Sequence, residues 1–303
     1  MSSVADTFPT FETYKPLVDL AIFEDLGGLG LDGDATSRLT IDAGAEGRAT
    51  VVQKAPGVAC GLPAIAPICN RFDPRLRVDL IDGAEGRFTD ASSKTPQPLA
   101  TIRGPLRSLL VAERTVLNFL GHLGGVASLT RRFVDEVEGT YAKIYDTRKT
   151  LPGWRNLEKY AVRCGGGMNH RFGLFDMVLV KDNHLAEASE DLSAAVQQLV
   201  ERSRSEDPAR PIEIEVDTIG QFHKVLAVAG VDVILLDNMT PPTMTQCVAA
   251  RDASPNQPAL EASGGITLET VRSAAETGVE RIALGALTHS AVNLDIGLDR
   301  ESR

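Results

Sequence analysis

The chain has few cysteines and no long uninterrupted apolar run. Its four cysteines, Cys60, Cys69, Cys164 and Cys247, stand far apart and form no CxxC pair. Disulfide scaffolds and zinc modules need closer, patterned spacing, so we expect four free, reduced thiols. No apolar stretch approaches the roughly 20 residues that span a bilayer, and the N-terminal MSSVADTFPTFETYKP has no basic flank followed by an apolar core. We therefore expect a cytoplasmic protein with no membrane partner.

The chain also lacks an excess of positive charge. It has 31 lysines and arginines against 41 acidic residues, a formal net charge of −10. Proteins that bind nucleic acids usually carry a basic face or tail, so we expect no nucleic-acid partner. With 303 residues and ordinary charged and hydrophobic fractions, the chain is long enough for a buried core in one large or two modest domains.

Positive charge is concentrated in one segment, residues 143–181. This segment holds eight lysines and arginines against three acidic residues, a net charge of +5, and it surrounds the triple glycine Gly165–Gly167. A local positive pocket in a negative protein suggests that the ligand is a small polyanion.

The chain changes character near residue 140. Before it, we expect a helix at Tyr14–Asp25, a glycine-rich loop at LGGLGLDGDATS, strands in GRATVVQK and RVDLIDGAEGRF, and a loop at TDASSKTPQP. Residues 106–137 have helical periodicity, and the glycines near His122–Gly125 predict a break between two helices.

After residue 140, short apolar runs alternate with helix-compatible stretches. The six runs are KIYDT, MVLVKD, IEIEVD, VDVILLDN, LEASGG and RIALGA. Nearly continuous apolar strands that alternate with helices indicate a parallel sheet covered on both faces. Six such units in succession favour a barrel over an open sheet.

Polar residues and glycines stand at or just past the ends of these runs. They are Arg148, Lys149, Lys181, Glu215, Asp237, Ser263 and Gly285. In an α/β barrel the carboxyl ends of the strands carry the active site, so six strands direct these groups to one mouth.

Each basic candidate has a plainer alternative. Arg148 and Lys149 are either a surface doublet or part of the mouth, and their place after a buried strand favours the mouth. Gly165–Gly167 is either a flexible connector or a backbone that approaches a ligand closely. Arg171 offers a planar fork that suits a carboxylate, whereas His170 either donates to the ligand or packs.

The other strand-end residues leave similar choices. Lys181 either extends outward or faces the mouth, as an anion clamp or a Schiff-base nucleophile. Glu215 and Asp237 are either paired with cations or hold ribose hydroxyls or Mg²⁺. Ser263–Gly265 and Leu284–Ala286 are either simple turns or phosphate-binding loops.

These motifs resemble the quinolinate phosphoribosyltransferase family, also called carboxylating nicotinate-nucleotide pyrophosphorylases. The resemblance runs from Glu24 to Ile296 and is carried by DTRKTLPGWRNLEKYAVRCGGGMNHRFGLFDMVLVKDNH, with ERTVLNFLGHLGGVASLTR upstream and IEIEVD, ILLDN, LEASGGI and LGALTHSA downstream. It implies an α/β protein with an N-terminal α/β sandwich-like domain at 1–118, to which the tail at about 290–303 returns. The implied second domain, at 119–289, is an incomplete TIM-like α/β barrel that carries the active site.

The resemblance also implies a reaction. The phosphoribosyl group of 5-phosphoribosyl 1-diphosphate passes to quinolinate in the presence of Mg²⁺, with release of diphosphate and CO₂. The product is nicotinate mononucleotide, for NAD biosynthesis.

Individual residues match the family's functional positions. The implied substrate-binding residues are Arg114, Thr147, Arg148, His170, Arg171, Lys181, Ser263, Gly264, Gly265, Gly285 and Ala286. The implied catalytic residues are Lys149, Lys181, Glu215 and Asp237, and Glu215 and Asp237 also contact Mg²⁺, partly through water or substrate. In the family the arginine that matches Arg114 enters from a neighbouring subunit, which implies a homodimer with shared active sites and leaves higher oligomers open.

The chain departs from the family pattern in two longer loops, at 26–37 and 90–98. We expect them to alter the entrance and subunit packing and not the chemistry. Two other functions stay open. A non-catalytic or molybdenum-transport-associated relative that binds a phosphoribosyl-type ligand is expected to have lost part of the basic set, which is complete here. A class I aldolase would use Lys181 as its Schiff base, which the number of cations argues against.

Overall fold

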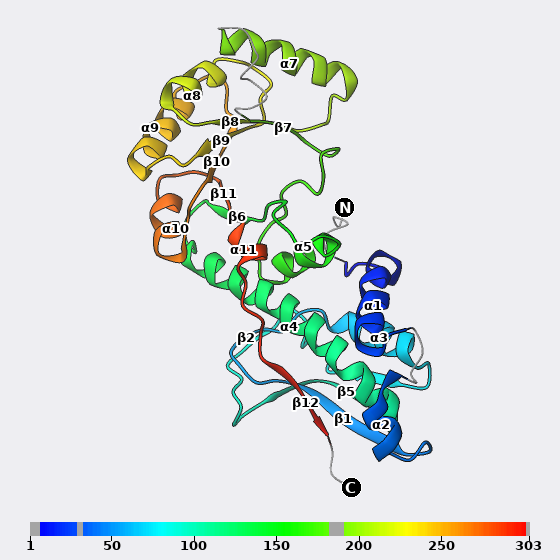
Figure 1. Ribbon diagram of the computed structural model, residues 1–303. Coiled ribbons are helices and arrows are strands. Elements are labelled where there is room, and N and C mark those ends of the chain that lie inside the picture. Colours follow the sequence, from blue (N-terminus) through cyan, green and yellow to red (C-terminus); the bar gives the residue numbers. More distant parts are fainter. Residues whose placement is uncertain (1–6, 29–32, 182–190, 301–303) are drawn as a thin grey trace. The chain divides into compact units, whose positions relative to one another are not determined.

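The computed structural model of the chain describes residues 7–28, 33–181 and 191–300 (Figure 1). The chain divides into two compact units, each built from segments far apart in the sequence. Unit 1 comprises residues 1–131, 150–166 and 286–303, and unit 2 comprises residues 132–149 and 167–285. Residues 119–131, 150–166 and 286–289, which we expected in the barrel domain, are grouped with unit 1. The glycine-rich loop at 26–37 lies partly outside the described residues.

Unit 1 contains a four-stranded antiparallel sheet with the order β12-β1-β5-β3. Its strands are β1 (Glu46–Gln53), β3 (Arg77–Leu80), β5 (Gln97–Pro105) and β12 (Ile296–Arg300). The C-terminal strand β12 pairs with β1, so the end of the chain completes a sheet begun near its start. A separate short pair joins β2 (Gly57–Val58) to β4 (Phe88–Thr89).

Helices complete unit 1. They are α1 (Phe11–Leu26), α2 (Ala35–Thr40), the 3-10 turn η3 (Leu62–Ala64), α3 (Ile65–Phe72), most of α4 (Leu106–Glu136), α5 (Arg155–Cys164) and α11 (Ala286–His289). Helix α1 ends at Gly27, whose φ of 68° lies in the left-handed region that glycine adopts without strain. The Asp34 side chain accepts a hydrogen bond from the Ser37 amide and caps α2.

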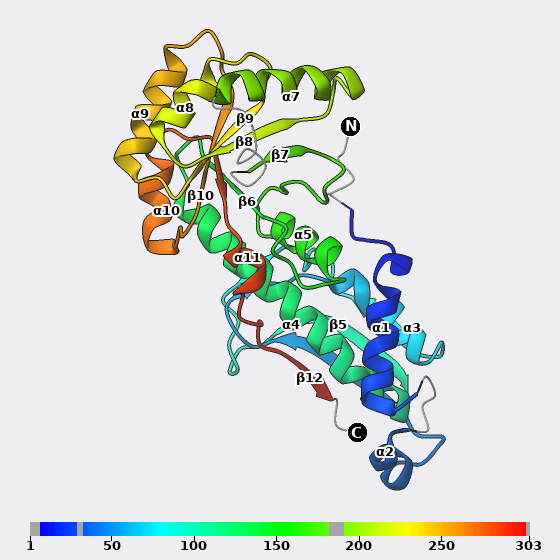
Figure 2. The same cartoon turned by 45° about the horizontal axis from the view of Figure 1, so that its top comes forward.

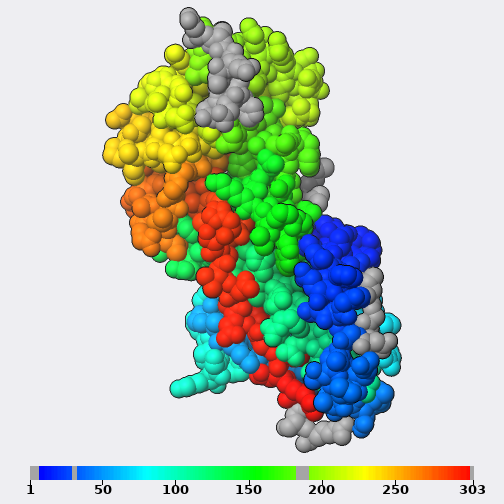
Figure 3. Space-filling model, in the orientation of Figure 1, coloured from blue at the N-terminus to red at the C-terminus, as the bar shows by residue number. Residues whose placement is uncertain are grey.

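Helix α4 is one continuous helix, so the predicted break near His122–Gly125 is wrong. The glycines serve packing instead. A Cβ atom on Gly125 would lie 2.2 Å from the Val292 carbonyl oxygen, and the Leu294 amide donates to the Gly121 carbonyl at 2.8 Å. The missing side chains therefore let residues 292–294 lie directly against the helix. In Figures 1 and 3 the red C-terminal segment runs along the surface beside green α4.

Unit 2 contains a six-stranded parallel sheet with the order β6-β11-β10-β9-β8-β7. Its strands are β6 (Lys143–Tyr145), β7 (Val178–Val180), β8 (Ile212–Val216), β9 (Val233–Asp237), β10 (Ala259–Ser263) and β11 (Arg281–Ala283). All six predicted runs form strands. Within the described residues β6 and β7 are edge strands, so the sheet stays open, as an incomplete barrel requires.

Four helices connect the strands of unit 2: α7 (Leu192–Glu206), α8 (Ile219–Leu226), α9 (Pro241–Asp252) and α10 (Leu268–Ala275). Figure 2 shows α8, α9 and α10 side by side along one face of the sheet. Alternation along β8 places Ile212, Ile214 and Val216 on one face and two glutamates on the other. Across both units, none of the described helices is long and apolar enough to cross a membrane.

Candidate active site

The parallel sheet brings the predicted strand-end residues to one edge. Thr147, Arg148 and Lys149 follow β6, Lys181 follows β7, Glu215 lies near the end of β8, Asp237 ends β9, Ser263 ends β10 and Gly285 follows β11. Asp237 and Ser263 are direct register partners on neighbouring strands. The predicted mouth is therefore a continuous edge of unit 2. Arg114 and Ala286 belong to unit 1, where Arg114 is exposed on α4.

Lys181 faces the neighbouring strand. Its Nζ atom lies 2.5 Å from Glu215 Oε2, and the Glu215 side chain is 10% exposed. Lys181 is exposed, so the ion pair ties its ammonium to the largely buried carboxylate of the neighbouring strand. A lysine held in this way at the edge of the sheet suits an anion clamp.

Two arginines lie close together at this edge. Arg171 is half-buried, and its pKa is lowered first by burial and then by the positive charge of Arg148. Nη1 of Arg171 donates to the Met177 carbonyl at 3.3 Å, and the Lys149 amide donates to Thr147 Oγ1 at 3.0 Å. Two guanidinium groups held near each other are a site for an anion, because an anion relieves their repulsion.

The triple glycine has structural functions at its first two positions. Gly165 follows the last residue of α5, and a Cβ atom there would lie 2.4 Å from the Ala127 carbonyl oxygen. Gly166 has a φ of 88°, in the left-handed region. Both residues belong to unit 1, so in this unit they end a helix and allow close packing against α4.

The turn after β10 is shaped by glycine. Gly264 has a φ of 92°, and a Cβ atom there would lie 2.3 Å from Asn238 Oδ1. Gly265 has a φ of 62° and open space around it. Asn238, with a φ of 52°, donates from Nδ2 to Asp237 Oδ2 at 2.6 Å and from its amide to the Ser263 carbonyl at 2.9 Å. The Ser263–Gly265 backbone is thus fixed in place, and the space around Gly265 is open to a ligand.

A group of buried charges lies on the face of β8, β10 and β11 that also carries the candidate residues. His170 Nε2 lies 2.9 Å from Glu213 Oε2 and 3.3 Å from Glu261 Oε1. Arg281 Nε donates to Glu261 Oε2 at 2.6 Å. The sequence analysis missed Glu213, Glu261 and Arg281. A charged residue in the middle of a buried strand was the signal that could have found them, because burying a carboxylate without a partner is unfavourable.

Protonation within this group follows from the partners. Burial alone lowers the pKa of His170, but Glu213 and Glu261 outweigh it and raise the pKa to about 9. The Arg171 amide donates to His170 Nδ1 at 2.7 Å, so Nδ1 is an acceptor and the ring proton is on Nε2, between the two carboxylates. The hydrogen bond to Nδ1 favours the neutral ring and the two carboxylates favour the charged ring, and in either form Nε2 carries a proton between Glu213 and Glu261. Burial and the charge of Glu261 raise the pKa of Glu213.

Glu215 and Asp237 fit a hard cation such as Mg²⁺. They lie on adjacent strands, and the register pairs Glu215 with Leu235, two residues before Asp237, so both carboxylates leave the same face. Carboxylate oxygens are the donors that Mg²⁺ takes, one or two from the protein and the rest from water or phosphate.

A parallel α/β sheet whose carboxyl edge gathers cations, two carboxylates and a glycine turn defines an α/β-barrel enzyme with an anionic substrate. Comparison with known proteins narrows this class. Residues 34–124 match the family description quinolinate phosphoribosyl transferase, N-terminal domain, and residues 126–299 match the C-terminal domain of the same family. The chain belongs to the quinolinate phosphoribosyltransferase family.

Relatives and solved structures agree with this family. A Mycobacterium leprae protein named nicotinate-nucleotide pyrophosphorylase (carboxylating) is 42% identical over 296 residues, covering 95% of this chain and 98% of that protein. A probable enzyme of the same name from Bacillus subtilis is 38% identical, covering 94% and 92%. The Francisella tularensis nicotinate-nucleotide pyrophosphorylase structure has a TM-score of 0.87 at 30% identity, covering 99% of this chain and 100% of that one. The Ehrlichia chaffeensis structure has a TM-score of 0.83 at 36% identity, covering 95% and 98%.

Proposed function

We propose that this chain transfers the phosphoribosyl group of 5-phosphoribosyl 1-diphosphate to quinolinate with loss of CO₂ and diphosphate. The product is nicotinate mononucleotide, which places the chain in the de novo synthesis of NAD. Family membership and the names of the relatives support this proposal. The structural observation that carries it is the carboxyl edge of the parallel sheet, where Arg148 follows β6, Lys181 follows β7 and the charge of Arg148 acts on half-buried Arg171. Three cations at one edge of the sheet suit a dicarboxylate.

On the acceptor side, the cations bind and orient quinolinate. Arg171 presents a planar fork to one carboxylate, and Arg148 and Lys181 neutralise the other. His170 lies beside Arg171 and supports its place. The four residues together hold the pyridine nitrogen toward the ribosyl donor.

On the donor side, the Ser263–Gly265 turn and Gly285 offer backbone amides to phosphate oxygens. Lys149 neutralises developing negative charge on the diphosphate, while Glu215 and Asp237 hold ribose hydroxyls or metal-bound water. Mg²⁺, when bound by Glu215 and Asp237, supplies further charge neutralisation for the leaving diphosphate.

The chemistry needs no protein nucleophile. The bond between ribose C1 and the diphosphate oxygen breaks, C1 gains oxocarbenium character, and the pyridine nitrogen forms the new bond to C1. The resulting pyridinium stabilises the electron pair left on the ring carbon when the adjacent carboxylate departs as CO₂, and a proton then takes that position. The cations of this chain stabilise the charges that develop, which is the largest contribution that such a site makes.

We further propose that the active site is shared between two subunits of a homodimer in the cytoplasm. Arg114 is exposed on α4 and belongs to unit 1, and it matches the family's arginine that enters from a neighbour. The four cysteines are free thiols, which suits a reducing compartment.

Release of labelled CO₂ from quinolinate tests the function. We expect release that depends strictly on added 5-phosphoribosyl 1-diphosphate and yields nicotinate mononucleotide. Absence of CO₂ release, together with binding of phosphoribosyl ligands, would support a non-catalytic relative. Trapping of Lys181 by borohydride with a carbonyl substrate would support an aldolase.

A further inference from the structure

Of the buried group Glu213, Glu261, His170 and Arg281, only His170 has a role in the reaction as described so far. Both glutamates are fully buried, His170 is 7% exposed, and the Arg281 side chain is 14% exposed. The residues come from β8, β10, β11 and the segment 167–171, so the group joins three strands to the chain that carries Arg171. Burying two carboxylates side by side is unfavourable, and replacement by apolar residues is often neutral or stabilising. Stability therefore does not explain this group.

The contacts instead fix the orientation of one ring and the backbone next to it. Glu213 and Glu261 both face Nε2 of His170, and Nδ1 of the same ring accepts the Arg171 amide at 2.7 Å. The His170 amide donates to Asp146 Oδ1 at 2.8 Å. The imidazole thus has a carboxylate pair on one side and the Arg171 backbone on the other, which leaves it one orientation.

Arg281 fixes the carboxylate pair in turn. Its Nε atom holds Glu261 Oε2 at 2.6 Å, and its guanidinium lies 4.1 Å from the centroid of the Tyr145 ring. Tyr145 ends β6, immediately before the segment that carries Arg148. The same group therefore contacts both chain segments that supply the arginine pair.

We propose that Glu213 and Glu261 are positioning residues that hold His170, and through it Arg171, in the orientation that binds a substrate carboxylate. This inference rests on the proposed function, because it assigns the carboxylate to quinolinate. Partners of this kind, which orient a binding group without touching the ligand, typically change affinity by roughly 10- to 100-fold when they are removed.

Steady-state kinetics of Glu213→Gln and Glu261→Gln test the proposal, with quinolinate and the ribosyl donor varied separately. We expect KM for quinolinate to rise by about tenfold or more, while KM for the ribosyl donor stays within about twofold. A matched control is Glu280→Gln, because Glu280 also lies next to β11 but pairs with Arg251 at 2.7 Å. The control should leave both KM values unchanged.

Two further measurements keep the test decisive. Arg281→Lys keeps the positive charge but loses the guanidinium contact with Glu261, so it should show the same selective rise even if a glutamate variant fails to fold. Equal changes in both KM values, or none, in folded variants would overturn the proposal. If the wild-type chain releases no CO₂ from quinolinate, the proposed function fails first; calorimetric binding of quinolinate to wild type and variants then decides the positioning role by itself.

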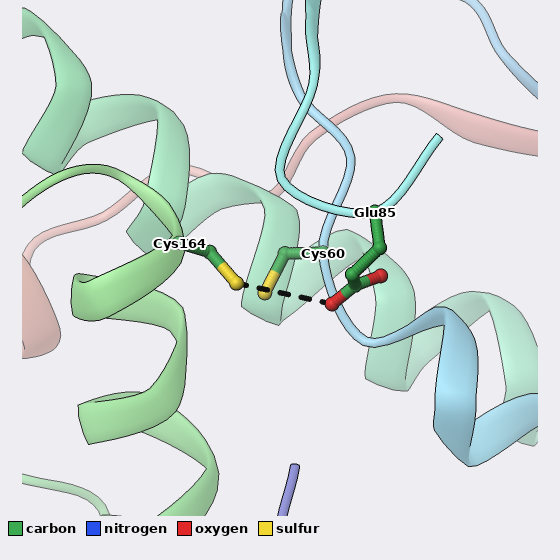
Figure 4. A group of neighbouring side chains, drawn as sticks. All are labelled: Cys60, Glu85 and Cys164. Carbon is green, nitrogen blue, oxygen red and sulfur yellow. Dashed lines mark hydrogen bonds between the residues drawn. The ribbon is translucent and has the colours of Figure 1, made fainter. Parts of the chain in front are cut away.

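A second, independent observation concerns Cys60, Glu85 and Cys164 in unit 1 (Figure 4). Cys60 follows β2, Glu85 precedes β4 and Cys164 is the last residue of α5. One sulfur or oxygen atom from each residue lies within 4.8 Å of the others, and Cys164 Sγ lies 3.8 Å from Glu85 Oε1. Ligands about 2.0 to 2.3 Å from a tetrahedral Zn²⁺ lie about 3.5 to 3.8 Å from each other, so these separations are near those of a metal site.

The carboxylate of this cluster is held in place by neutral donors. The Gly61 amide and Tyr160 hydroxyl donate to Oε1, and the Leu62 amide donates to Oε2, each at 2.9 Å. Oε1 is also the oxygen that faces Cys164 Sγ (Figure 4). Carboxylates that bind metals are commonly oriented by such outer hydrogen bonds. Burial raises the pKa of both Cys60 and Glu85, so negative charge here is unfavourable without a cation.

We infer that Cys60, Glu85 and Cys164 form a site for one thiophilic divalent cation of the Zn²⁺ type. Binding replaces the two thiol protons with the metal, which the two thiolates and the Glu85 carboxylate then hold. The site would join the β2 loop, the turn before β4 and the end of α5.

Titration with Zn²⁺ against a competing chelator tests this site in the full chain. We expect one tight site in the wild type and in the control Cys69→Ser, whose cysteine is buried elsewhere in unit 1. Cys164→Ser, at a half-exposed position that is easier to replace than Cys60, should weaken that site by at least about tenfold. Unchanged stoichiometry and affinity in Cys164→Ser would overturn the inference. So would a Cys60–Cys164 disulfide in place of bound metal, which mass spectrometry of the purified protein detects.

Discussion

At the scale of single residues, the candidate site brings together groups that repel one another. Burial, and then the positive charge of Arg148, lowers the pKa of Arg171. Lys181 is paired with Glu215 at 2.5 Å, so the repulsion is between the two arginines, and an anion that binds to both neutralises it. A ligand with two carboxylates neutralises more of the positive charge of the site than a ligand with one.

This arrangement predicts discrimination between quinolinate and nicotinate. Nicotinate lacks the 2-carboxylate, so it leaves Arg and Lys groups unpaired in a desolvated place, at a cost of about 2 to 5 kcal/mol. We expect kcat/KM for nicotinate to fall by at least about thirtyfold relative to quinolinate. Parallel assays with both acids check this. Comparable kcat/KM values would show that the cations do not bind the second carboxylate.

A second residue-scale prediction separates the two halves of the site. Arg171→Ala should mainly weaken quinolinate binding, because it removes a carboxylate fork. Asp237→Asn should mainly impair use of the ribosyl donor or Mg²⁺, because it removes a charge at the end of β9. Isothermal titration with each ligand separately measures this, and the opposite pattern would mean that the two subsites are exchanged.

A third prediction concerns Asp73, away from the site. Hydrogen bonds from Arg75, with a further one from Ser108, lower the pKa of buried Asp73 to about 2. A lowered pKa stabilises the fold above the ordinary value of 3.8, and the stabilisation is lost as pH falls from there toward 2. Allowing for water around the exposed Arg75, we expect Asp73→Asn to reduce the free energy of unfolding by about 1 kcal/mol at pH 7. Urea unfolding at several pH values should show this difference shrink below pH 4.

At the scale of secondary-structure elements, contacts with residues distant in the sequence determine whether a helix continues through glycines that would favour a break. Helix α4 contains Gly121, Gly124 and Gly125 and stays continuous because residues 292–294 lie against it. A glycine in a helix usually lowers stability by about 1 kcal/mol relative to alanine, so its presence here needs a packing reason.

This packing gives opposite predictions for two helical glycines. Gly125→Ala places a Cβ atom 2.2 Å from the Val292 carbonyl oxygen, so it should lower the free energy of unfolding by roughly 1 to 3 kcal/mol despite the better helix propensity. Gly220→Ala in α8 meets only Thr218 Oγ1 at 3.9 Å, so it should be neutral or slightly stabilising. Chemical denaturation of both variants tests the pair. Equal free energies of unfolding for the two variants would mean that residues 292–294 do not pack closely against α4.

At the scale of the whole molecule, we expect the proposed site to include a residue from a second copy of the chain. Arg114 belongs to unit 1 and the arginine pair to unit 2, and the resemblance to the family implies that the matching arginine enters from a neighbouring subunit. In a homodimer with a two-fold, isologous interface, each subunit can supply its Arg114 to the site of the other.

Mixed dimers test this arrangement. Arg114→Ala and Lys181→Ala chains should each be nearly inactive, whereas their mixture should recover up to roughly a quarter of wild-type activity, because half of the dimers then carry one intact site. Subunit exchange is verified separately with tagged chains. If exchange occurs and activity stays at the level of the single variants, Arg114 acts within its own chain or is structural.

The six strands of the parallel sheet, and the edge at which the candidate residues lie, could be predicted from the sequence. Apolar runs fix strands locally, and the carboxyl ends of parallel strands necessarily share one edge, so Lys181, Glu215, Asp237 and Ser263 followed from spacing alone. The charge of residues 143–181 likewise indicated an anionic ligand before any contact was known.

Contacts between residues far apart in the sequence could be identified only from the tertiary structure. The continuity of α4 depends on residues 292–294, the pairing of β1 depends on β12, and the buried group at His170 depends on Glu213 and Glu261 from two other strands. None of these partners is within one helical turn or one strand of the other, so local periodicity holds no information about them. Their meeting depends on the packing of the folded units, which places side chains together regardless of their separation along the chain.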